Sequence, residues 1–396
     1  MTDRITVQGL YKIFGKQPDQ AIRLLADGRS KEKVLAETDH VVALNDVTLS
    51  VPEGSIYMVM GLSGSGKSTL ARCINRLIEP SAGRILLDGE DITRASEARL
   101  RDLRRTRISM VFQHFALLPN KTVIENAEFG LKLRGVSPRE RRRKAEEVLT
   151  VVGLASWANY YPDALSGGMR QRVGLARALA TDADVLIMDE AFSALDPLIR
   201  TEMQDELLRL QRVLRKTILF ITHDFQEALR LGTRIAIMSD GALVREGTPQ
   251  DIVTSPDNDY VAAFTKGVDR ARVYDAASIM TATAPVVIGA DGLVSFGRLP
   301  EGEQAFAIDP NGRILGVLSP EDRRDLRQGM RLSAAPSRNF VAVKGKDKLC
   351  DVASACRAGA AMAVLDDDGR LAGSIDPVQI LARIGTPAAP PAQKHS

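Results

Sequence analysis

The 396-residue sequence is poor in cysteine and contains no long hydrophobic run. Its three cysteines, Cys73, Cys350 and Cys356, form no CxxC pair and no cluster with histidine, so neither a zinc site nor a disulfide framework is suggested. A reducing compartment fits this cysteine usage best. No apolar run approaches the roughly 18 residues that cross a bilayer, and the N-terminus lacks the apolar core and cleavage site of a signal peptide. We therefore expect no export, and any work at a membrane needs a partner chain.

The sequence also lacks a large excess of either sign of charge. Lys plus Arg number 53 and Asp plus Glu 50, so the net charge of +3 is too small to follow a nucleic-acid backbone by charge alone. The charged run at 139–147, RERRRKAEE, mixes both signs at helical spacing, which favours a solvated helix face. We expect no nucleic-acid partner. With 44% hydrophobic and 26% charged residues the composition is globular, and the length predicts two or three domains.

Strands and helices alternate over the first two thirds of the chain. Strand-like segments are ITVQGLYKIFG, VALNDVTLSV, SIYMVMG, ISMVFQ, DVLIMDE, TILFITHD and TRIAIMSDG. Several are apolar throughout, which is typical of strands buried on both faces. Helical patterns lie between them at 67–77, 138–151 and 200–214. This alternation predicts an α/β domain with a mostly parallel sheet that reaches to about residue 265.

A segment at about 17–40 interrupts the strand pattern. Its apolar residues follow helical spacing, Gly28 breaks the pattern, and Ser30 is placed to cap a second helix. We expect a short helical hairpin packed on the surface rather than a separate binding element.

The chain changes character after Gly267. Asp-Gly or Asn-Gly turns at 291–292, 311–312 and 368–369 each lie between short apolar strands. The segment 307–320, AIDPNGRILGVLSP, repeats without gaps at 364–377 as VLDDDGRLAGSIDP. This predicts a second domain with two copies of a small hairpin-plus-helix unit. The last stretch, TPAAPPAQKHS, is rich in proline and alanine and is predicted to be disordered.

The segment GLSGSGKST at 61–69 has the pattern of a phosphate-binding loop. It follows an apolar strand and precedes a helical pattern, which is the context such a loop needs. Glycines let backbone amides close around phosphates, Lys67 supplies a point charge, and Ser68 offers a hydroxyl to Mg²⁺. A glycine turn with a surface lysine is the weaker alternative. The predicted nucleotide contacts are Gly61, Leu62, Ser63, Gly64, Ser65, Gly66, Lys67, Ser68 and Thr69.

Two further motifs narrow the chemistry. The strand VLIMDE ends in two acids, of which Asp189 can hold Mg²⁺ through water, while Glu190 is placed to orient and polarise an attacking water. In LSGGMRQR, the residues Ser166, Gly167 and Gly168 precede a helical pattern and present a hydroxyl and amides to a second phosphate contact. The economical arrangement is a two-fold dimer in which this segment of one chain closes on the nucleotide of the other.

These motifs resemble, in type and in order, the nucleotide-binding subunits of ABC transporters, and the resemblance covers roughly residues 5–265. It implies an α/β fold: a P-loop ABC-type ATPase cassette with a helical subdomain. By resemblance, Gln113 in VFQHFALLPN touches Mg²⁺ or the attacking water and couples the site to a membrane partner. His223 in ITHD contacts the γ-phosphate and holds Glu190 in place, and Asp196 in SALD lies at the dimer seam.

The family also stacks adenine on an aromatic residue before the phosphate loop. Phe14 in YKIFGK is the best match, although the segment at 17–40 separates it from the next strand, and Tyr11 is the alternative. Base stacking accepts either ring.

The segment after Phe14, the long phosphate-loop block and the repeated tail together resemble the ATP-binding subunits of bacterial glycine betaine/proline importers. Their tails carry paired CBS-type modules linked to regulation by ionic strength or a nucleotide. The resemblance implies a cassette at 1–267, a small α+β tandem CBS-like regulatory domain at 271–384 and a disordered tail at 385–396. No acid–base or nucleophile constellation follows Gly267, so we expect this tail to regulate rather than catalyse.

The resemblance implies an ATPase that uses ATP and Mg²⁺ to power import through separate permease subunits. It further implies a second copy of the chain, a periplasmic or tethered solute-binding protein, and a peripheral position on the cytoplasmic face of the bacterial inner membrane. Binding of ATP would close the dimer, and hydrolysis would reopen it. Alternatives are an importer for another solute, such as choline, carnitine, trimethylamine N-oxide or an amino acid, and, more remotely, an ABC ATPase that is not involved in transport.

Overall fold

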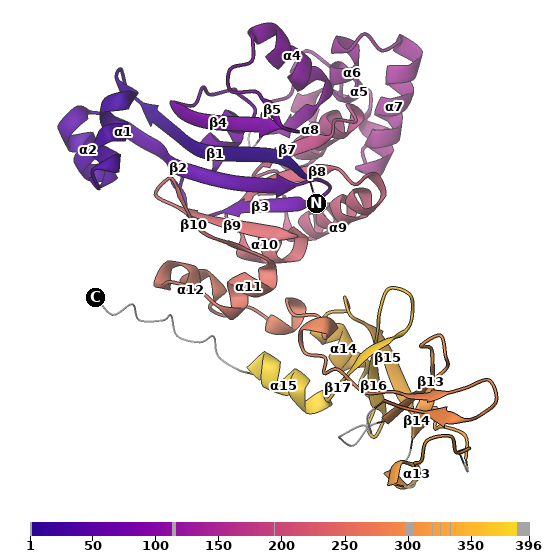
Figure 1. Cartoon of the computed structure of the whole chain (residues 1–396). Coiled ribbons are helices and arrows are strands. Elements are labelled where there is room, and N and C mark those ends of the chain that lie inside the picture. Colours follow the sequence, from indigo (N-terminus) through magenta and orange to yellow (C-terminus); the bar gives the residue numbers. More distant parts are fainter. Residues whose placement is uncertain are drawn as a thin grey trace. The chain divides into compact units, whose positions relative to one another are not determined.

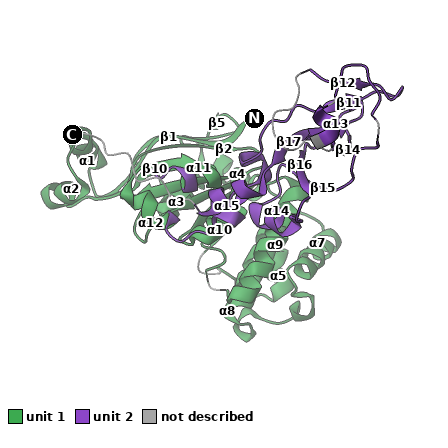
Figure 2. Cartoon of the chain, turned by 90° about the horizontal axis from the view of Figure 1, so that it is seen from below, with its two compact units in different colours: residues 1–252, 257–264 green, residues 253–256, 265–396 purple. Residues whose placement is uncertain are grey.

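The computed structural model describes residues 2–112, 116–193, 195–297, 305–318, 320–324, 326–332 and 334–385. The chain divides into two compact units, coloured separately in Figure 2. The first contains residues 1–252 and 257–264, and the second contains residues 253–256 and 265–396.

The first unit is built on a six-stranded sheet in the order β10-β9-β3-β8-β7-β6. Its strands are β3 (Ile56–Met60), β6 (Ile108–Val111), β7 (Val185–Asp189), β8 (Thr217–Thr222), β9 (Arg234–Ser239) and β10 (Ala242–Gly247). All of them run parallel except the edge strand β10. Every residue of β3, β7 and β8 is buried, as the uninterrupted apolar runs predict. The predicted mostly parallel sheet is thus confirmed.

The first two predicted strands do not join this sheet. They are β1 (Asp3–Phe14) and β2 (Val41–Pro52), and they form a four-stranded antiparallel sheet, in the order β2-β1-β4-β5, with β4 (Ala82–Leu87) and β5 (Glu90–Asp91). The expectation of one sheet was therefore incomplete. The physical reason is visible in β1 and β2, which bury alternate residues and expose the others, as antiparallel strands with one solvated face do.

The main core of the first unit lies between the two sheets. It joins Val7 and Leu49 of the antiparallel sheet to Val59 and Ile221 of the parallel sheet, and Leu70 of α3 (Lys67–Ile74) belongs to the same cluster. Helix α3 is thus held in the core, and the loop before it is fixed by packing on both sides.

The remaining helices of this unit cover the parallel sheet and extend beyond it (Figure 1). They are α4 (Glu97–Thr106), α5 (Val123–Ala127), α6 (Phe129–Leu133), α7 (Pro138–Val151), α8 (Gly167–Ala180), α9 (Pro197–Leu214) and α10 (Phe225–Leu231), with 3₁₀ turns at Ala155–Trp157 and Pro162–Ala164. Helices α11 (Pro249–Thr254) and α12 (Asp259–Thr265) follow β10. Helix α7 pairs Arg142 with Glu146 and Arg143 with Glu147, so its charged face is solvated as predicted.

The segment at 17–40 forms the predicted helical hairpin. Its helices are α1 (Pro18–Ala26) and α2 (Lys31–Thr38), and they lie beyond the ends of β1 and β2 in Figure 1. The Ser30 hydroxyl accepts a hydrogen bond from the Lys33 amide, so Ser30 is the N-cap of α2.

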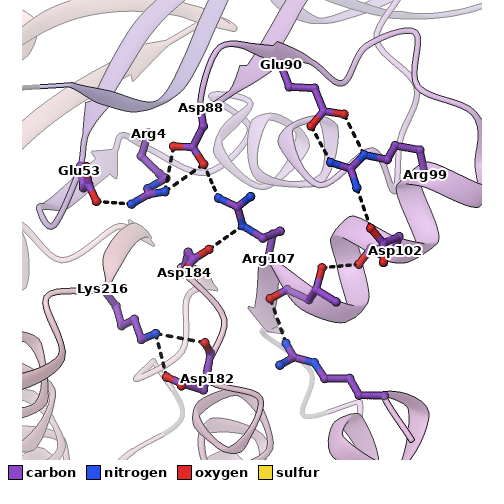
Figure 3. A network of polar contacts seen from close by, with 12 residues as sticks. Arg4, Glu53, Asp88, Glu90, Arg99, Asp102, Arg107, Asp182, Asp184 and Lys216 are labelled. Carbon is purple, nitrogen blue, oxygen red and sulfur yellow. Dashed lines mark hydrogen bonds and ion pairs between the residues drawn. The ribbon is translucent and has the colours of Figure 1, made fainter.

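Charged side chains gather at the edge of the parallel sheet where β6, β7 and β8 begin (Figure 3). Arg107, just before β6, pairs with Asp184, just before β7, and also with Asp88. Arg4 pairs with Asp88 as well, at 2.9 Å, so the network ties both sheets together. Strands β6, β7 and β8 are parallel, so this network lies at the edge opposite to their carboxyl ends.

The second unit contains the repeat. One copy forms a hairpin of β13 (Ala305–Ile308) and β14 (Ile314–Leu318) followed by α13 (Pro320–Arg324). The other forms β16 (Ala361–Leu365) and β17 (Leu371–Ile375) followed by α15 (Pro377–Gly385). The predicted pair of hairpin-plus-helix units is thereby confirmed. Strands β11 (Val286–Ile288) and β12 (Val294–Ser295) join the first copy, and β15 (Phe340–Lys344) joins the second, with α14 (Leu349–Ala355) after it. Two 3₁₀ turns, Arg270–Arg272 and Ala276–Ser278, precede β11.

The shared Asp of the repeat has the same structural role in both copies. In the first turn the Asp309 carboxylate accepts hydrogen bonds from the backbone amides of Asn311 and Arg313. In the second, the Asp366 carboxylate accepts from the amides of Asp368 and Arg370 in the same way. Each aspartate thus closes its own turn, which explains why both copies keep it.

The C-terminal end departs slightly from prediction. Gly385 is the last residue of α15 rather than the first of a disordered tail, and residues 386–396 lie outside the described residues. In the described part of the chain, no helix combines the length and the apolar character needed to cross a membrane.

Candidate active site

A cavity of about 680 Å³ lies at the carboxyl ends of β3, β7 and β8. Parallel α/β sheets bind ligands at this edge, because the loops that follow the strands meet there. The cavity is lined by Val41, Val42, Ala43, Leu62, Ser63, Gly64, Gly66, Lys67, Ser68, Thr69, Glu190 and His223. The structure therefore brings most of the predicted phosphate loop together with two residues predicted to act in hydrolysis.

Lys67 lies at the base of the loop with only 5% of its surface exposed. Its Nζ donates hydrogen bonds to the carbonyl oxygens of Gly61 at 2.9 Å and Leu62 at 2.8 Å, and to the Ser65 hydroxyl at 3.4 Å. Burial lowers the pKa of Lys67, while the charges of Glu190 and Asp189 act in the opposite direction. Gly61 and Ser65 thus contact Lys67 but do not line the cavity, whereas the rest of the predicted loop does.

The loop also depends on a close backbone approach at Gly66. This residue has φ of +98°, and a Cβ placed there would lie 2.5 Å from the carbonyl oxygen of Ala43 in β2. Only glycine fits such a contact without displacing the strand. The phosphate loop and the β2 wall of the cavity are therefore packed directly against each other.

Ser68 and Asp189 form a pair of hard oxygen donors behind the loop. The Ser68 hydroxyl donates to Asp189 Oδ1 at 2.7 Å. Asp189 Oδ2 is buried and accepts no hydrogen bond from the described residues; Arg72 Nη2 lies 3.7 Å away. Burial raises the pKa of Asp189, and the Ser68 hydrogen bond and the Arg72 charge oppose this shift. An unsatisfied carboxylate oxygen beside a hydroxyl fits the ligands that Mg²⁺ prefers.

Glu190 and His223 lie next to each other in the lining of the cavity. His223 Nδ1 lies 3.4 Å from Glu190 Oε2, and the glutamate side chain is 16% exposed whereas the histidine is 59% exposed. Glu190 has φ of +49°, an uncommon conformation for a residue with a side chain. Its amide donates to Ile221 of β8, and its carbonyl accepts from the Ser193 hydroxyl, so the conformation is held from two sides.

The signature segment lies elsewhere in the chain. Ser166 is the N-cap of α8, and its hydroxyl accepts from the Met169 amide, so the predicted helix N-terminus is present. Asp196 caps α9 in the same way, through the Ile199 amide. A Cβ on Gly168 would lie 3.2 Å from Leu195, so the signature and the SALD turn adjoin. None of Ser166, Gly167, Gly168 and Asp196 lines the cavity of its own chain.

Gln113 lies in the stretch 113–115, which is outside the described residues. A groove of about 390 Å³ is lined by Phe112 and Ala116 on either side of that stretch, and by Leu77, Leu118 and Phe129 among others. Gln171 of α8 donates to the Phe112 carbonyl at 3.4 Å. Phe112 and Ala116, the described residues on either side of 113–115, thus both line this largely apolar groove.

The two candidate aromatic residues differ in position. Phe14 ends β1, is 43% exposed, and pairs in register with Val41, which lines the cavity. Tyr11 is half-buried and pairs with Ala82 of β4, and burial raises its pKa. Neither ring lines the cavity directly. Phe14 is therefore the cross-strand neighbour of a residue in the cavity wall, which favours Phe14 over Tyr11 as the residue that stacks on adenine.

We expect Phe14→Ala to raise the Kd for ATP by about tenfold, because loss of base stacking costs roughly 1–3 kcal/mol. Tyr11→Ala should change the Kd by less than about twofold, since Tyr11 pairs away from the cavity wall. Equilibrium binding of a fluorescent ATP analogue measures both. A larger loss from Tyr11→Ala than from Phe14→Ala would reverse the assignment.

Several residues of the site carry no recognisable signal in the sequence. The cavity wall Val41–Ala43 belongs to an ordinary apolar strand, and only the sheet register brings it to the phosphate loop. Tyr260 of α12 donates to the Met238 carbonyl at 3.1 Å and accepts from the Leu62 amide at 3.3 Å, so it supports the loop from a distant part of the chain. Such long-range contacts follow from tertiary packing and not from a local motif.

Comparisons with known proteins agree with this geometry. The family pattern described as ABC transporter matches residues 44–193. The chain is 45% identical over 389 residues to the glycine betaine/proline betaine transport system ATP-binding protein ProV of Escherichia coli (strain K12), covering 96% of this chain and 97% of that protein. It is 46% identical over 376 residues to the glycine betaine transport ATP-binding protein OpuAA of Bacillus subtilis (strain 168), covering 94% and 90%.

A solved structure also matches. It is an ATP-binding cassette in a dimeric post-hydrolysis state bound to ADP and phosphate, with 32% identity and a TM-score of 0.54. The match covers 62% of this chain and 98% of the solved chain. The likeness to this structure is therefore that of a complete cassette, whereas the likeness to the two relatives extends over nearly the whole chain.

Proposed function

The chain belongs to the ATP-binding subunits of ABC transporters of the glycine betaine type, and from this premise we propose how its residues power solute import. It is an ATPase whose hydrolysis is coupled to transport. The observation that carries the proposal is the likeness to glycine betaine subunits over more than 90% of the chain, tail included. The cavity supplies the chemistry: a phosphate loop, a buried lysine and a carboxylate with its histidine.

Each predicted site residue has a role in this proposal. The loop amides and Lys67 bind the β- and γ-phosphates of ATP. Glu190 accepts a proton from the attacking water, and His223, 3.4 Å away, orients the glutamate and contacts the γ-phosphate. We assign Ser68 and Asp189 to hold Mg²⁺, joined by Gln113; the ion would neutralise charge developing on the phosphates. The left-handed backbone of Glu190 sets the direction in which its side chain leaves the end of β7.

Two copies of the chain complete the site. In one chain, the signature residues Ser166, Gly167 and Gly168 do not line the cavity. We propose that they contact the γ-phosphate held by the other copy, with Asp196 at the seam between the copies. The solved dimeric cassette supports this arrangement.

The transporter needs further partners. We propose that separate permease subunits cross the membrane and that an apolar segment of a permease docks in the groove lined by Phe112 and Ala116. A periplasmic or tethered solute-binding protein selects the solute. The chain then works peripherally at the cytoplasmic face of the bacterial inner membrane. No nucleic-acid partner is proposed.

Uptake of radiolabelled glycine betaine tests the proposed substrate. Cells that carry this subunit with its permease should take up glycine betaine faster at raised osmolality, and Glu190→Gln should abolish the uptake. Choline, carnitine, proline and trimethylamine N-oxide serve as competitors. Uptake of another solute that depends on Glu190 but not on osmolality would support the role as a transport ATPase and would contradict glycine betaine as the substrate.

The second unit is proposed to be a tandem CBS-like regulatory domain. Its two hairpins pack on each other through Phe306 of one copy and Ala361 and Ala363 of the other, as two related modules would. It is proposed to respond to ionic strength or to bind a nucleotide rather than to catalyse. The proposed boundaries remain a cassette at 1–267 and a regulatory domain at 271–384.

Deleting residues 271–396 should leave ATP hydrolysis in place while removing the salt dependence of transport. In the intact transporter, reconstituted in vesicles, we expect the transport rate to change by about fivefold or more between low and high salt. A factor of about five is the lower end of the coupling usually found between two sites. The truncated transporter should show nearly the same rate at both. Unchanged salt dependence after the deletion would remove the regulatory role.

A further inference from the structure

The helical hairpin α1–α2 is joined to the cassette by its own small hydrophobic cluster. Ala21 of α1 and Val34 of α2 are completely buried there against Ile13 of β1 and Val42 of β2. The hairpin therefore packs on the ends of the two strands from which it emerges, and its apolar residues fix the position of those ends.

A buried histidine holds the base of the hairpin. His40 is 6% exposed, and its Nε2 accepts a hydrogen bond from the Gln17 amide at 3.1 Å, where the hairpin begins. Its Nδ1 lies 2.7 Å from the carbonyl oxygen of Thr38, where the hairpin ends, and donates to it. One neutral imidazole thus joins the entry and the exit of the hairpin.

Gly15 leaves room for this ring. Its φ is +151°, and a Cβ at that position would lie 2.2 Å from His40 Cδ2. Any side chain there would displace the imidazole. Gly15 follows Phe14, the predicted adenine-stacking residue, and His40 precedes Val41, so the two contact partners flank the pair Phe14–Val41.

Val42 connects the hairpin to the nucleotide cavity. It belongs to the hydrophobic cluster that holds α1 and α2, and it also lines the cavity together with Val41 and Ala43. Because Val42 belongs both to this cluster and to the cavity wall, a shift of the hairpin is expected to move this part of the wall.

We propose that the hairpin α1–α2, fastened by His40, is a positioning element for the base of the bound nucleotide. It holds Phe14 and the wall Val41–Ala43 where the adenine stacks, and it leaves the grip on the phosphates to the loop. The inference rests on the proposed placement of the base beside Phe14. It makes His40 a positioning residue rather than a catalytic one.

The test compares two ligands of the full-length chain, ATP and inorganic tripolyphosphate, which lacks the base. We expect His40→Ala to raise the Kd for ATP by about three- to tenfold, as loss of an aromatic contact does, and to change the Kd for tripolyphosphate by less than about twofold. Gly15→Ala, which displaces the ring from the other side, should act in the same direction. His40→Gln keeps a hydrogen-bond acceptor and should recover part of the affinity.

Glu37→Ala, an exposed change on α2, is the matched control and should leave both constants unchanged. Thermal unfolding verifies that each variant is folded. In the background of Phe14→Ala, His40→Ala should cause a smaller loss than in the wild type, because the two changes act in part on the same contact.

Three results would overturn the inference. These are an unchanged Kd for ATP in both His40→Ala and Gly15→Ala, a parallel loss for ATP and tripolyphosphate, and full additivity with Phe14→Ala. A failure of the underlying assignment looks different, since Phe14→Ala alone would then leave the binding of ATP unchanged.

Discussion

Glu190→Gln should abolish ATP turnover while leaving ATP binding nearly intact. The amide has the shape of the carboxylate but cannot accept a proton from the attacking water, and loss of general-base catalysis costs about 10²- to 10⁴-fold in rate. Lys67, Ser68 and the loop amides are untouched, so the Kd for ATP should change by less than about threefold. The closed dimer reopens only after hydrolysis, so dimers of Glu190→Gln should accumulate when ATP is present.

Phosphate release at saturating ATP measures the first effect, and light scattering with and without ATP measures the second. Glu202→Gln provides a matched control, because Glu202 is exposed on α9 of the same unit. It should behave like the wild type in both assays. Near-normal hydrolysis in Glu190→Gln would refute the general-base assignment.

Lys67→Ala should weaken ATP binding itself. A hydrogen bond to a charged group contributes about 1.5–3 kcal/mol, so loss of the ammonium should raise the Kd for ATP by about 10- to 100-fold. The ligand-free protein should lose little stability in return. Burial lowers the pKa of Lys67, so its charged form is less favourable in the folded protein than in the unfolded chain, although the Glu190 and Asp189 charges oppose this effect.

Titration with a fluorescent ATP analogue measures the affinity, and thermal unfolding without nucleotide measures the stability. Lys132→Ala, an exposed change on α6, controls for loss of one positive charge. Unchanged nucleotide affinity in Lys67→Ala would count against the phosphate-loop assignment, whereas a large loss of ligand-free stability would point to a structural lysine.

The parts of the site that the sequence predicts are those made by local motifs. A glycine-rich loop between a buried strand and a helix can adopt few other conformations. Gly66 and Lys67 therefore lie at the start of α3, as their spacing predicts. Acidic residues after a buried strand must emerge at its carboxyl end, and Glu190 does. The predicted N-terminal residues Ser30 and Ser166 are equally local, because each is fixed by a hydrogen bond within three residues. The sequence placed Asp196 only at the dimer seam, and its cap of α9 is a finding of the structure.

The remainder depends on contacts between distant segments. The separate antiparallel sheet arises because β1 pairs with both β2 and β4, and no single motif encodes that pairing. His40 carried no signal in the sequence, since its two hydrogen bonds join Gln17 to Thr38 only after both helices have folded back. The signature segment has a predictable cap, but its place relative to a nucleotide depends on a second chain.

The strand order also has a consequence for synthesis on the ribosome. The antiparallel sheet uses strands that lie within the first 91 residues, so it can pair soon after it emerges. The strand before the phosphate loop cannot, because Ile56 of β3 pairs with Ile218 of β8 and its other neighbour is β9. At 5–20 residues per second, the 179 residues from the end of β3 to the end of β9 take about 9 to 36 s to be made. A nascent chain should therefore bind ATP only late in its synthesis, when the strands up to β9 have been made.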